Sequence, residues 1–584
     1  MNWSLKELYS SFESKEFLDD LNKAKKMIEE IETFSKEFCN LKSVEVLERY
    51  IKHFGEYRTV ISKLITFSSL SFSVNTSDTS ALKYAEKIKK MNSDITGPMV
   101  EFSYYLKNIG ENKLKEIINS SKVLEEFEYH ILEIFNGSLH LLSKEEEVLI
   151  SKLKQTGSAS FATLQSQLSS SLLVEIDGEK LPLQAARNLA YDKDPLVRKN
   201  AYYAELKAYK VNEVASAACL NAIKGEVITL SKERGYESPL YETLFNARMK
   251  KETLDALISS IEEFLPKLRE YYKLKAKKLG HENGLPFYDL FAPMGGSKGK
   301  ISIEEAKSIV VDNFSSFSNE LGDFARNAFE KNWIDILPKK GKVGGAFCSN
   351  IKAINESRIL VNFTGSLNNA VTLAHELGHG FHGQNIFEEN ILNTSYPMPL
   401  AETASIFCET IVKKSALEKA GKDEKLTILE ASLQGYGQVI VDIYSRFIFE
   451  TNLFETRRDH ALSVDELKKY MLDAQKKAYG DALNHESLHP YMWMNKPHYY
   501  YSERNFYNFP YAFGLLFSKG LYSLYLSDKD EFVKNYNIML KNTGKLDIES
   551  VAKLMNIDVT SKEFWSSSLK EIEKEIDEFS KIVN

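Results

Sequence analysis

The residues most able to do chemistry are two histidines and a glutamate that lie within five positions of one another. They are His375, Glu376 and His379, in the order His-Glu-x-x-His. On a helix, residues four positions apart project from the same face, so both imidazoles can bind one metal ion. Glu376 then lies beside the first imidazole, where it can take a proton from a water molecule held at the metal. This spacing predicts a hydrolytic metal site, and imidazole and carboxylate ligands favour zinc.

A catalytic zinc site needs a third protein ligand and an open position for water. One class of enzyme supplies a third histidine six positions after the second, with a glycine halfway between them. That arrangement is excluded here, because His382 stands where the glycine would be and Asn385 stands where the third histidine would be. His382 is interpreted as a residue near the site rather than as a ligand.

The alternative third ligand is a glutamate on the following helix, predicted over residues 398–412. Pro399 is suited to the start of that helix, and Glu402 lies in a narrow polar stripe on an otherwise apolar segment. Such a stripe is what a buried helix that faces a metal requires. Glu409, two turns beyond Glu402, is predicted to orient one of the histidines through its distal N–H group.

The elements that must position these residues are mostly helices. Apolar residues recur at three- and four-residue steps over residues 18–31 and 254–265, and Asn368 and Asn369 are predicted to cap the helix that carries the two histidines. Residues 338–345 are predicted to form a loop, 346–348 a turn and 358–363 a strand. A small hairpin or sheet beside the metal site is therefore expected, whose edge can pair with an extended peptide.

Composition and charge exclude several kinds of partner. The 584 residues are 43% hydrophobic and 27% charged, with a net charge of −7, which is typical of a folded protein and not of a nucleic-acid binder. The lysines at 273, 275, 277 and 278 are interpreted as a solvated helix face. Four cysteines without a Cys-x-x-Cys pair indicate a reducing compartment. The first residues contain no apolar run typical of a signal peptide, and no run of 18 apolar residues occurs, so we expect neither a signal peptide nor a membrane span. We expect a cytoplasmic protein without nucleic-acid or membrane partners, and we leave its oligomeric state open.

Three segments together resemble the oligoendopeptidase F branch of the M3 metallopeptidases, which are relatives of thimet oligopeptidase. They are AHELGH at 374–379, AETAS at 401–405 and a tyrosine-rich block at 489–514. The resemblance implies a mainly α, bowl- or clam-shaped gluzincin fold, with a small β-sheet beside the active-site helix and a deep channel for unstructured oligopeptides. With the polar segment at 192–195 as the boundary, it implies an N-terminal helical region at 1–195 and a catalytic domain at 196–584.

Carried over residue by residue, the resemblance makes His375, His379 and Glu402 the ligands of one Zn²⁺ per chain and Glu376 the general base. In this family a histidine followed by tyrosines stabilises the oxyanion, and the candidates here are His498, Tyr507 and Tyr511, with Tyr500 in reserve. Where many relatives have a second tyrosine shortly after the first, this chain has Phe509.

The expected activity is hydrolysis of internal bonds in oligopeptides, and two other interpretations stay open. An exopeptidase would need a fixed charge beside the zinc for one terminus of the peptide, and the sequence does not locate such a charge. A non-catalytic peptide-binding protein with a vestigial zinc site is the second alternative. The intact Glu376 argues against it.

Overall fold

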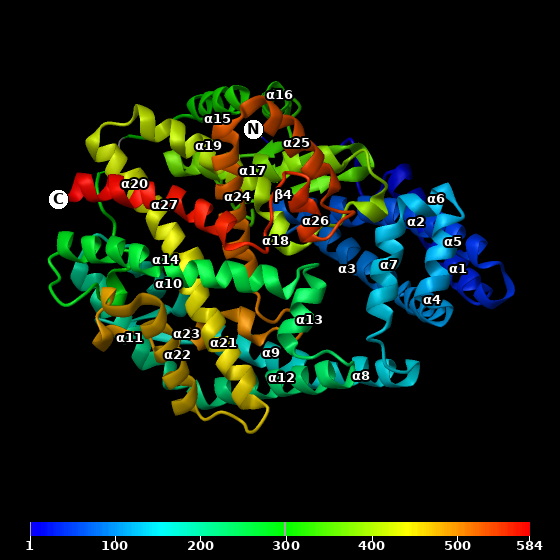
Figure 1. Ribbon diagram of the computed structural model, residues 1–584, viewed down its shortest axis with the longest axis horizontal. Coiled ribbons are helices and arrows are strands. Elements are labelled where there is room, and N and C mark those ends of the chain that lie inside the picture. Colours follow the sequence, from blue (N-terminus) through cyan, green and yellow to red (C-terminus); the bar gives the residue numbers. More distant parts are fainter. Residues whose placement is uncertain (1, 297–298) are drawn as a thin grey trace. The chain divides into compact units, whose positions relative to one another are not determined.

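The fold is mainly helical, as predicted (Figure 1). The described residues form two small sheets, of which only the one beside the helix with the two histidines was expected. The computed structural model describes residues 2–296 and 299–584. The chain forms two compact units, each made of three separate stretches. The first unit comprises Met1–Leu141, Gly299–Ser415 and Leu524–Asn556, and the second comprises Leu142–Lys298, Ala416–Ser523 and Ile557–Asn584.

The first unit begins with seven helices that enclose a hydrophobic core of their own. They are α1 (Lys15–Ser35), α2 (Ser43–Val74), α3 (Thr79–Ser93), α4 (Thr96–Ile109), α5 (Glu111–Asn119), α6 (Lys122–Glu126) and α7 (Glu128–Ser138). Its later helices are α15 (Ile303–Phe317), α16 (Asn319–Glu330), α17 (Leu367–Ile386), α18 (Met398–Ala401), α25 (Lys529–Asn542) and α26 (Ile548–Lys553). Ile351 and Leu360, from the sheet described next, pack into the same core and so fix the sheet to the N-terminal helices.

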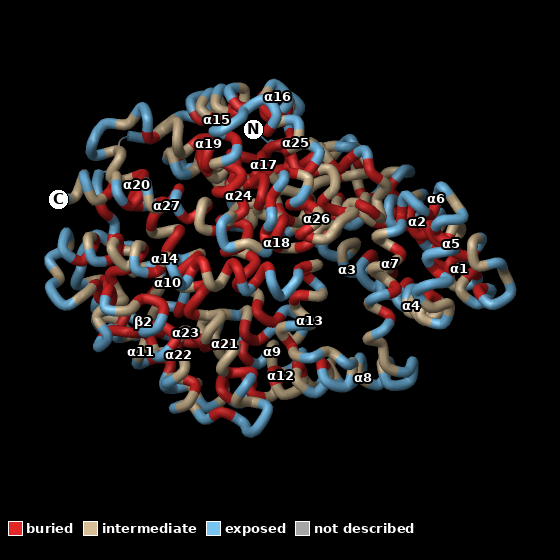
Figure 2. Tube along the Cα trace, viewed as in Figure 1, coloured by how far each residue is buried: buried red, intermediate tan, exposed pale blue. Residues whose placement is uncertain are grey.

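A three-stranded sheet in the first unit supports α17. Its strands are β3 (Ile334–Asp335), β4 (Phe347–Ile351) and β5 (Glu356–Leu360), in the order β3-β5-β4, with β4 antiparallel to β5. The predicted strand at 358–363 is found at 356–360, so it starts two residues earlier and ends three residues earlier. The predicted turn at 346–348 is wrong, because Phe347 and Cys348 pair with β5. Helix α17 packs against β4 and β5, and it is drawn largely in red in Figure 2 because most of its residues are buried.

The second unit is also helical and contains one hairpin. Its helices are α8 (Lys144–Thr156), α9 (Ser158–Ser170), α10 (Leu183–Asn188), α11 (Pro195–Tyr209), α12 (Glu213–Glu233), α13 (Pro239–Asn246), α14 (Lys251–Lys278), α20 (Lys422–Tyr436), α21 (Ile443–Arg457), α22 (Val464–Tyr479), α23 (Met492–Asn495) and α27 (Lys562–Val583). Helices α19 (Thr403–Lys419) and α24 (Phe509–Ser527) include residues of both units. The hairpin pairs β1 (Leu173–Ile176) with β2 (Glu179–Pro182), and a π-helical segment, Gly437–Asp442, joins α20 to α21.

The lysines of α14 do not all lie on a solvated face. Lys273, Lys277 and Lys278 are exposed, but Lys275 is buried and forms an ion pair with Glu430. The interpretation of this run as one solvated face is therefore wrong at Lys275.

No helix in the described ranges is both long and apolar enough to cross a membrane.

Candidate metal centre

The two histidines of the motif lie in the middle of α17, which is capped at its start by Ser366. The Ser366 side chain accepts a hydrogen bond from the backbone N–H of Asn369, and the Asn369 side chain accepts one in return from the backbone N–H of Ser366. This reciprocal capping satisfies backbone donors that a helix start leaves free. The predicted cap at Asn368–Asn369 is therefore corrected: Ser366 is the cap residue, and Asn369 acts from the third helical position.

Two glycines of α17 allow other elements to approach the helix closely. A Cβ atom on Gly378 would lie 2.6 Å from the Ala404 carbonyl oxygen and 2.7 Å from the Ser405 Cα atom, so only glycine fits against α19 there. A Cβ atom on Gly383 would overlap the Asn350 side chain of β4. That asparagine donates from Nδ2 to the His379 carbonyl oxygen over 3.0 Å and so fixes α17 to the sheet.

Glu402 lies between two helices rather than inside one, which differs from the predicted continuous helix over 398–412. It is the C-terminal cap of the short helix α18, with φ −87° and ψ 1°, and α19 begins at Thr403. This backbone region is sparsely populated and common among active-site residues. At this boundary between α18 and α19, the Glu402 carboxylate points toward the two histidines. Pro399 lies in the first turn of α18, as expected.

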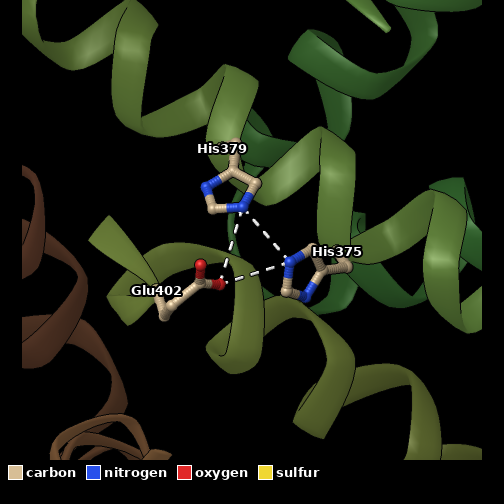
Figure 3. A group of neighbouring side chains, drawn as sticks. All are labelled: His375, His379 and Glu402. Atoms are coloured by element: carbon tan, nitrogen blue, oxygen red, sulfur yellow. Dashed lines mark hydrogen bonds and ion pairs between the residues drawn. The ribbon is translucent and has the colours of Figure 1, made fainter. Parts of the chain in front are cut away.

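Three side-chain atoms converge at the spacing of zinc ligands (Figure 3). The Nε2 atoms of His375 and His379 are 3.2 Å apart, and Glu402 Oε2 lies 3.3 Å from the first and 3.6 Å from the second. Ligands about 2.1 Å from a tetrahedral zinc ion are about 3.4 Å from each other. Two imidazoles and one carboxylate are also a known ligand set of catalytic zinc, so the residues present fit this ion.

The partners of these side chains fix which atom of each can bind a cation. His375 Nδ1 donates to Glu409 Oε1 over 2.6 Å, which leaves the lone pair of its Nε2 for the cation. Glu409 is held in turn by Lys413 Nζ at 2.6 Å, and Ser405 Oγ donates to Glu402 Oε2 over 3.0 Å. The hydrogen bond between Glu409 and His375 thus supports the orienting role predicted for Glu409.

The buried histidines and glutamates of this site shift one another's pKa values. Burial disfavours the charged His375 imidazole, but the hydrogen bonds that it donates to Glu402 and Glu409 outweigh burial and raise its pKa to about 10. Burial and the neighbouring His375 lower the pKa of His379 to about 4. Burial, against the attraction of His375, raises the pKa of Glu376 to about 7. One imidazole therefore carries a proton among acidic groups, and a cation that binds there displaces that proton.

His382 is not part of this donor set. It is fully buried, its Nε2 lies 2.8 Å from Thr543 Oγ1, and its ring stacks on Tyr396 with centroids 4.2 Å apart. Burial lowers the pKa of His382 to about 3, so it is neutral in the folded chain.

The aromatic candidates lie in the second unit and form a chain of rings. The ring centroids of His498 and Tyr507 are 5.2 Å apart, and those of Tyr507 and Tyr511 are 5.8 Å apart. All three residues are partly exposed. Tyr500 instead packs in the hydrophobic core of the unit with its hydroxyl buried, which makes it unsuited to contact a substrate.

Sequence reasoning missed two residues that support the site. Lys413 could have been found, because it lies four positions after Glu409 on one helix and such pairs face each other. No pattern in the sequence indicated Asn350. It contacts α17 from β4, and the beginning of that strand was predicted to be a turn.

The comparisons with known proteins agree with this geometry. A family model described as peptidase family M3 matches residues 188–571, and one described as oligopeptidase F matches residues 106–172. The fold and the candidate donor set, two histidines and one glutamate, are those of a helical metallopeptidase. The chain belongs to peptidase family M3, in its oligoendopeptidase F branch. The predicted family and enzyme class are thereby confirmed, and the family implies zinc and oligopeptide substrates.

Individual relatives cover most of the chain. Oligopeptidase PepF of Bacillus subtilis is 28% identical over 82% of this chain and 72% of its own length. An oligoendopeptidase F homolog of Lactococcus lactis is 24% identical over 100% of this chain and 97% of its own. The solved structure of oligoendopeptidase F from Enterococcus faecium aligns with a TM-score of 0.73 at 19% identity, covering 97% of this chain and 99% of that one.

Proposed function

We propose that this protein is a zinc metalloendopeptidase that cuts internal bonds of short, unstructured oligopeptides. The observation that carries the proposal is the convergence of His375 Nε2, His379 Nε2 and Glu402 Oε2 at tetrahedral spacing. These three residues are proposed to hold one zinc ion per chain. Zinc, when bound, polarises the substrate carbonyl group and lowers the pKa of a water molecule beside it.

Glu376 is proposed as the general base. Its carboxylate takes a proton from the attacking water and later gives that proton to the leaving amine. A pKa raised to about 7 by burial supports this role, because a carboxyl group of that pKa both accepts and releases a proton near neutral pH.

His498, Tyr507 and Tyr511 are proposed to donate hydrogen bonds to the carbonyl oxygen as negative charge builds on it. Phenol hydroxyls stay protonated at neutral pH and suit this role. The partial exposure of the three side chains and their continuous ring contacts support the choice.

The edge of β4 is proposed to bind the substrate main chain. Among the strands of the described residues, β4 pairs with β5 alone, so a row of its backbone groups is available to an extended peptide. We also propose residues 1–195 and 196–584 as the N-terminal region and the catalytic domain.

A reducing cytoplasmic location is supported by the four cysteines, all of which are free thiols.

Mass-spectrometric mapping of products from peptides blocked at both ends tests the activity. We expect internal cuts that cease on chelation, return with zinc, and are nearly lost in Glu376→Gln although that variant keeps its metal. Cleavage restricted to peptides with a free terminus would indicate an exopeptidase instead. Peptide binding without cleavage by the zinc-loaded protein would indicate a binding protein.

A further inference from the structure

A cavity of about 190 Å³ lies within the second unit, lined only by residues of that unit. Its walls come from α10, α11, α14, α20 and α22, and from the segments before α15, after α20 and after α22. Its lining includes none of the proposed metal donors, the proposed general base or the three proposed oxyanion donors, so the proposed mechanism makes no use of this cavity.

The charges around the cavity leave one cation without a partner. Arg187 Nε pairs with Glu205 Oε1 at 3.2 Å, and Arg198 Nε pairs with Asp289 Oδ1 at 2.7 Å. Asp442 of the cavity wall pairs with Arg446. Lys496 also lines the cavity, and within residues 2–296 and 299–584 its ammonium group has neither a hydrogen bond nor an ion pair. Four cationic groups and three carboxylates thus lie in or next to the cavity wall, and a single negative charge would balance them.

Lys496 is charged at neutral pH despite its surroundings. Burial, with Arg446 nearby, lowers its pKa to about 8, and Asp442 opposes this shift. Burying a charged ammonium group next to other cations costs free energy unless an anion lies close to it. The cavity is therefore better suited to an anion than to a neutral or cationic ligand.

The remaining walls are aromatic or carry amides. Tyr202, Phe287 and Tyr288 form one connected aromatic group, and Tyr191 and Phe291 lie with ring centroids 5.0 Å apart. The side chains of Gln434 and Gln438 flank the start of the π-helical segment and also line the cavity. Aromatic walls favour a flat apolar group, and amides can hydrogen-bond a peptide group. Local π-helical turns are frequent at functional sites.

We propose that this cavity binds the C-terminal residue of a short peptide, with its α-carboxylate at Lys496 and an aromatic side chain against the tyrosine and phenylalanine wall. One carboxylate matches the single unbalanced positive charge, whereas a phosphate dianion exceeds it. The volume holds one residue rather than a long segment, so the ligand is a peptide end or a short product.

Calorimetric titration of the full chain with N-acetyl-phenylalanine tests the proposal. The probe carries the carboxylate and the ring. We expect saturable binding, at least tenfold weaker binding of N-acetyl-phenylalaninamide, and no displacement of the probe by equimolar inorganic phosphate. Because carboxylates also bind zinc, the titration is repeated with excess chelator, and the affinity is expected to stay the same.

Two substitutions locate the site. Lys496→Met is expected to weaken binding of the acid at least tenfold, whereas Lys277→Met, which removes an exposed charge of the same unit, leaves it unchanged. Lys496→Arg keeps the charge and is expected to retain binding, which controls for misfolding. Equal binding of acid and amide, loss of binding on chelation, or unchanged binding by Lys496→Met would overturn the proposal. The readout is binding, so a failure here is distinct from a failure to hydrolyse peptides.

Discussion

Glu409 acts on the metal site through His375 rather than by direct ligation. Its Oε1 accepts the Nδ1 proton of His375, and its charge is balanced by Lys413. Glu409→Gln removes the charge and the ion pair while it keeps the shape, so we expect zinc affinity to fall about 10- to 100-fold. Competition with a chromophoric chelator measures this. Glu418→Gln, an exposed change on the same helix, should have no effect, and an equal affinity in both variants would contradict the account.

His382 makes stability depend on pH. Its pKa is about 3 in the folded chain, and an unfolded histidine has a pKa near 6.5. Between these values the unfolded chain binds more protons, so the free energy of unfolding falls as the pH falls below 6.5, by up to about 1.4 kcal/mol per pH unit.

Urea unfolding from pH 4.5 to 7.5 measures this slope. We expect His382→Gln to flatten it below pH 6.5 and the exposed change His485→Gln to leave it as it is. A slope that is identical in wild type and His382→Gln would remove this histidine as its source.

The donor residues were predictable to different degrees. His375, Glu376 and His379 follow from spacing alone, because one helical turn fixes their geometry. Glu402 was identified as the third donor by elimination and by the apolar residues around it. Its position between two helices was not predicted, because the end of α18 at this residue follows from how the chain packs. Asn350 could not be predicted, because it reaches α17 only through tertiary contact.

At the scale of elements, the contact between α17 and α19 depends on Gly378. Gly378→Ala places a methyl group 2.6 Å from the Ala404 carbonyl oxygen, so α19 must move away. We expect a loss of about 1–3 kcal/mol in the free energy of unfolding and weaker zinc binding. Gly435→Ala in α20 is the matched control, because a Cβ atom there meets nothing within 4 Å, and it should be neutral or stabilising. Similar effects of the two changes on zinc binding would argue against the packing role.

A buried polar network holds the segment that carries Tyr507. Lys224 Nζ donates to Glu450 Oε1 over 3.0 Å and to Asn505 Oδ1 over 2.8 Å, and Asn508 Nδ2 donates to Glu450 Oε2 over 3.1 Å. Lys224→Met leaves a carboxylate buried and unpaired, which costs about 3–5 kcal/mol. Denaturant unfolding measures the loss. Part of it should return in Lys224→Met/Glu450→Leu, and a double variant no more stable than the single one would refute the pairing.

The strands were harder to predict than the helices. Residues 347–351 lack strict alternation and follow a glycine-rich loop, so the edge strand β4 looked like a turn. The hairpin β1–β2 could have been predicted from the pair Asp177-Gly178, which lies between Ile176 and Glu179 and is typical of a two-residue hairpin turn. Both of these residues have positive φ, as a tight hairpin turn requires. Helices were easier because three- and four-residue spacing repeats over many turns.

At the scale of the whole molecule, each compact unit is assembled from three separate stretches of chain. Sequence order alone could not give this arrangement, because local patterns do not report which distant segments pack together. The metal donors nevertheless come from one stretch, residues 375–402, within a single unit. The geometry of the proposed metal site thus depends on the packing of the first unit alone.

The most direct test of the account is the zinc content and zinc affinity of the purified chain and its variants. We predict about one zinc ion per wild-type chain, the same in Glu376→Gln, and almost none in His379→Ala or Glu402→Ala. Elemental analysis after dialysis against a weak chelator gives the ratio. Wild-type zinc content and affinity in Glu402→Ala would contradict the claim that this glutamate completes the site.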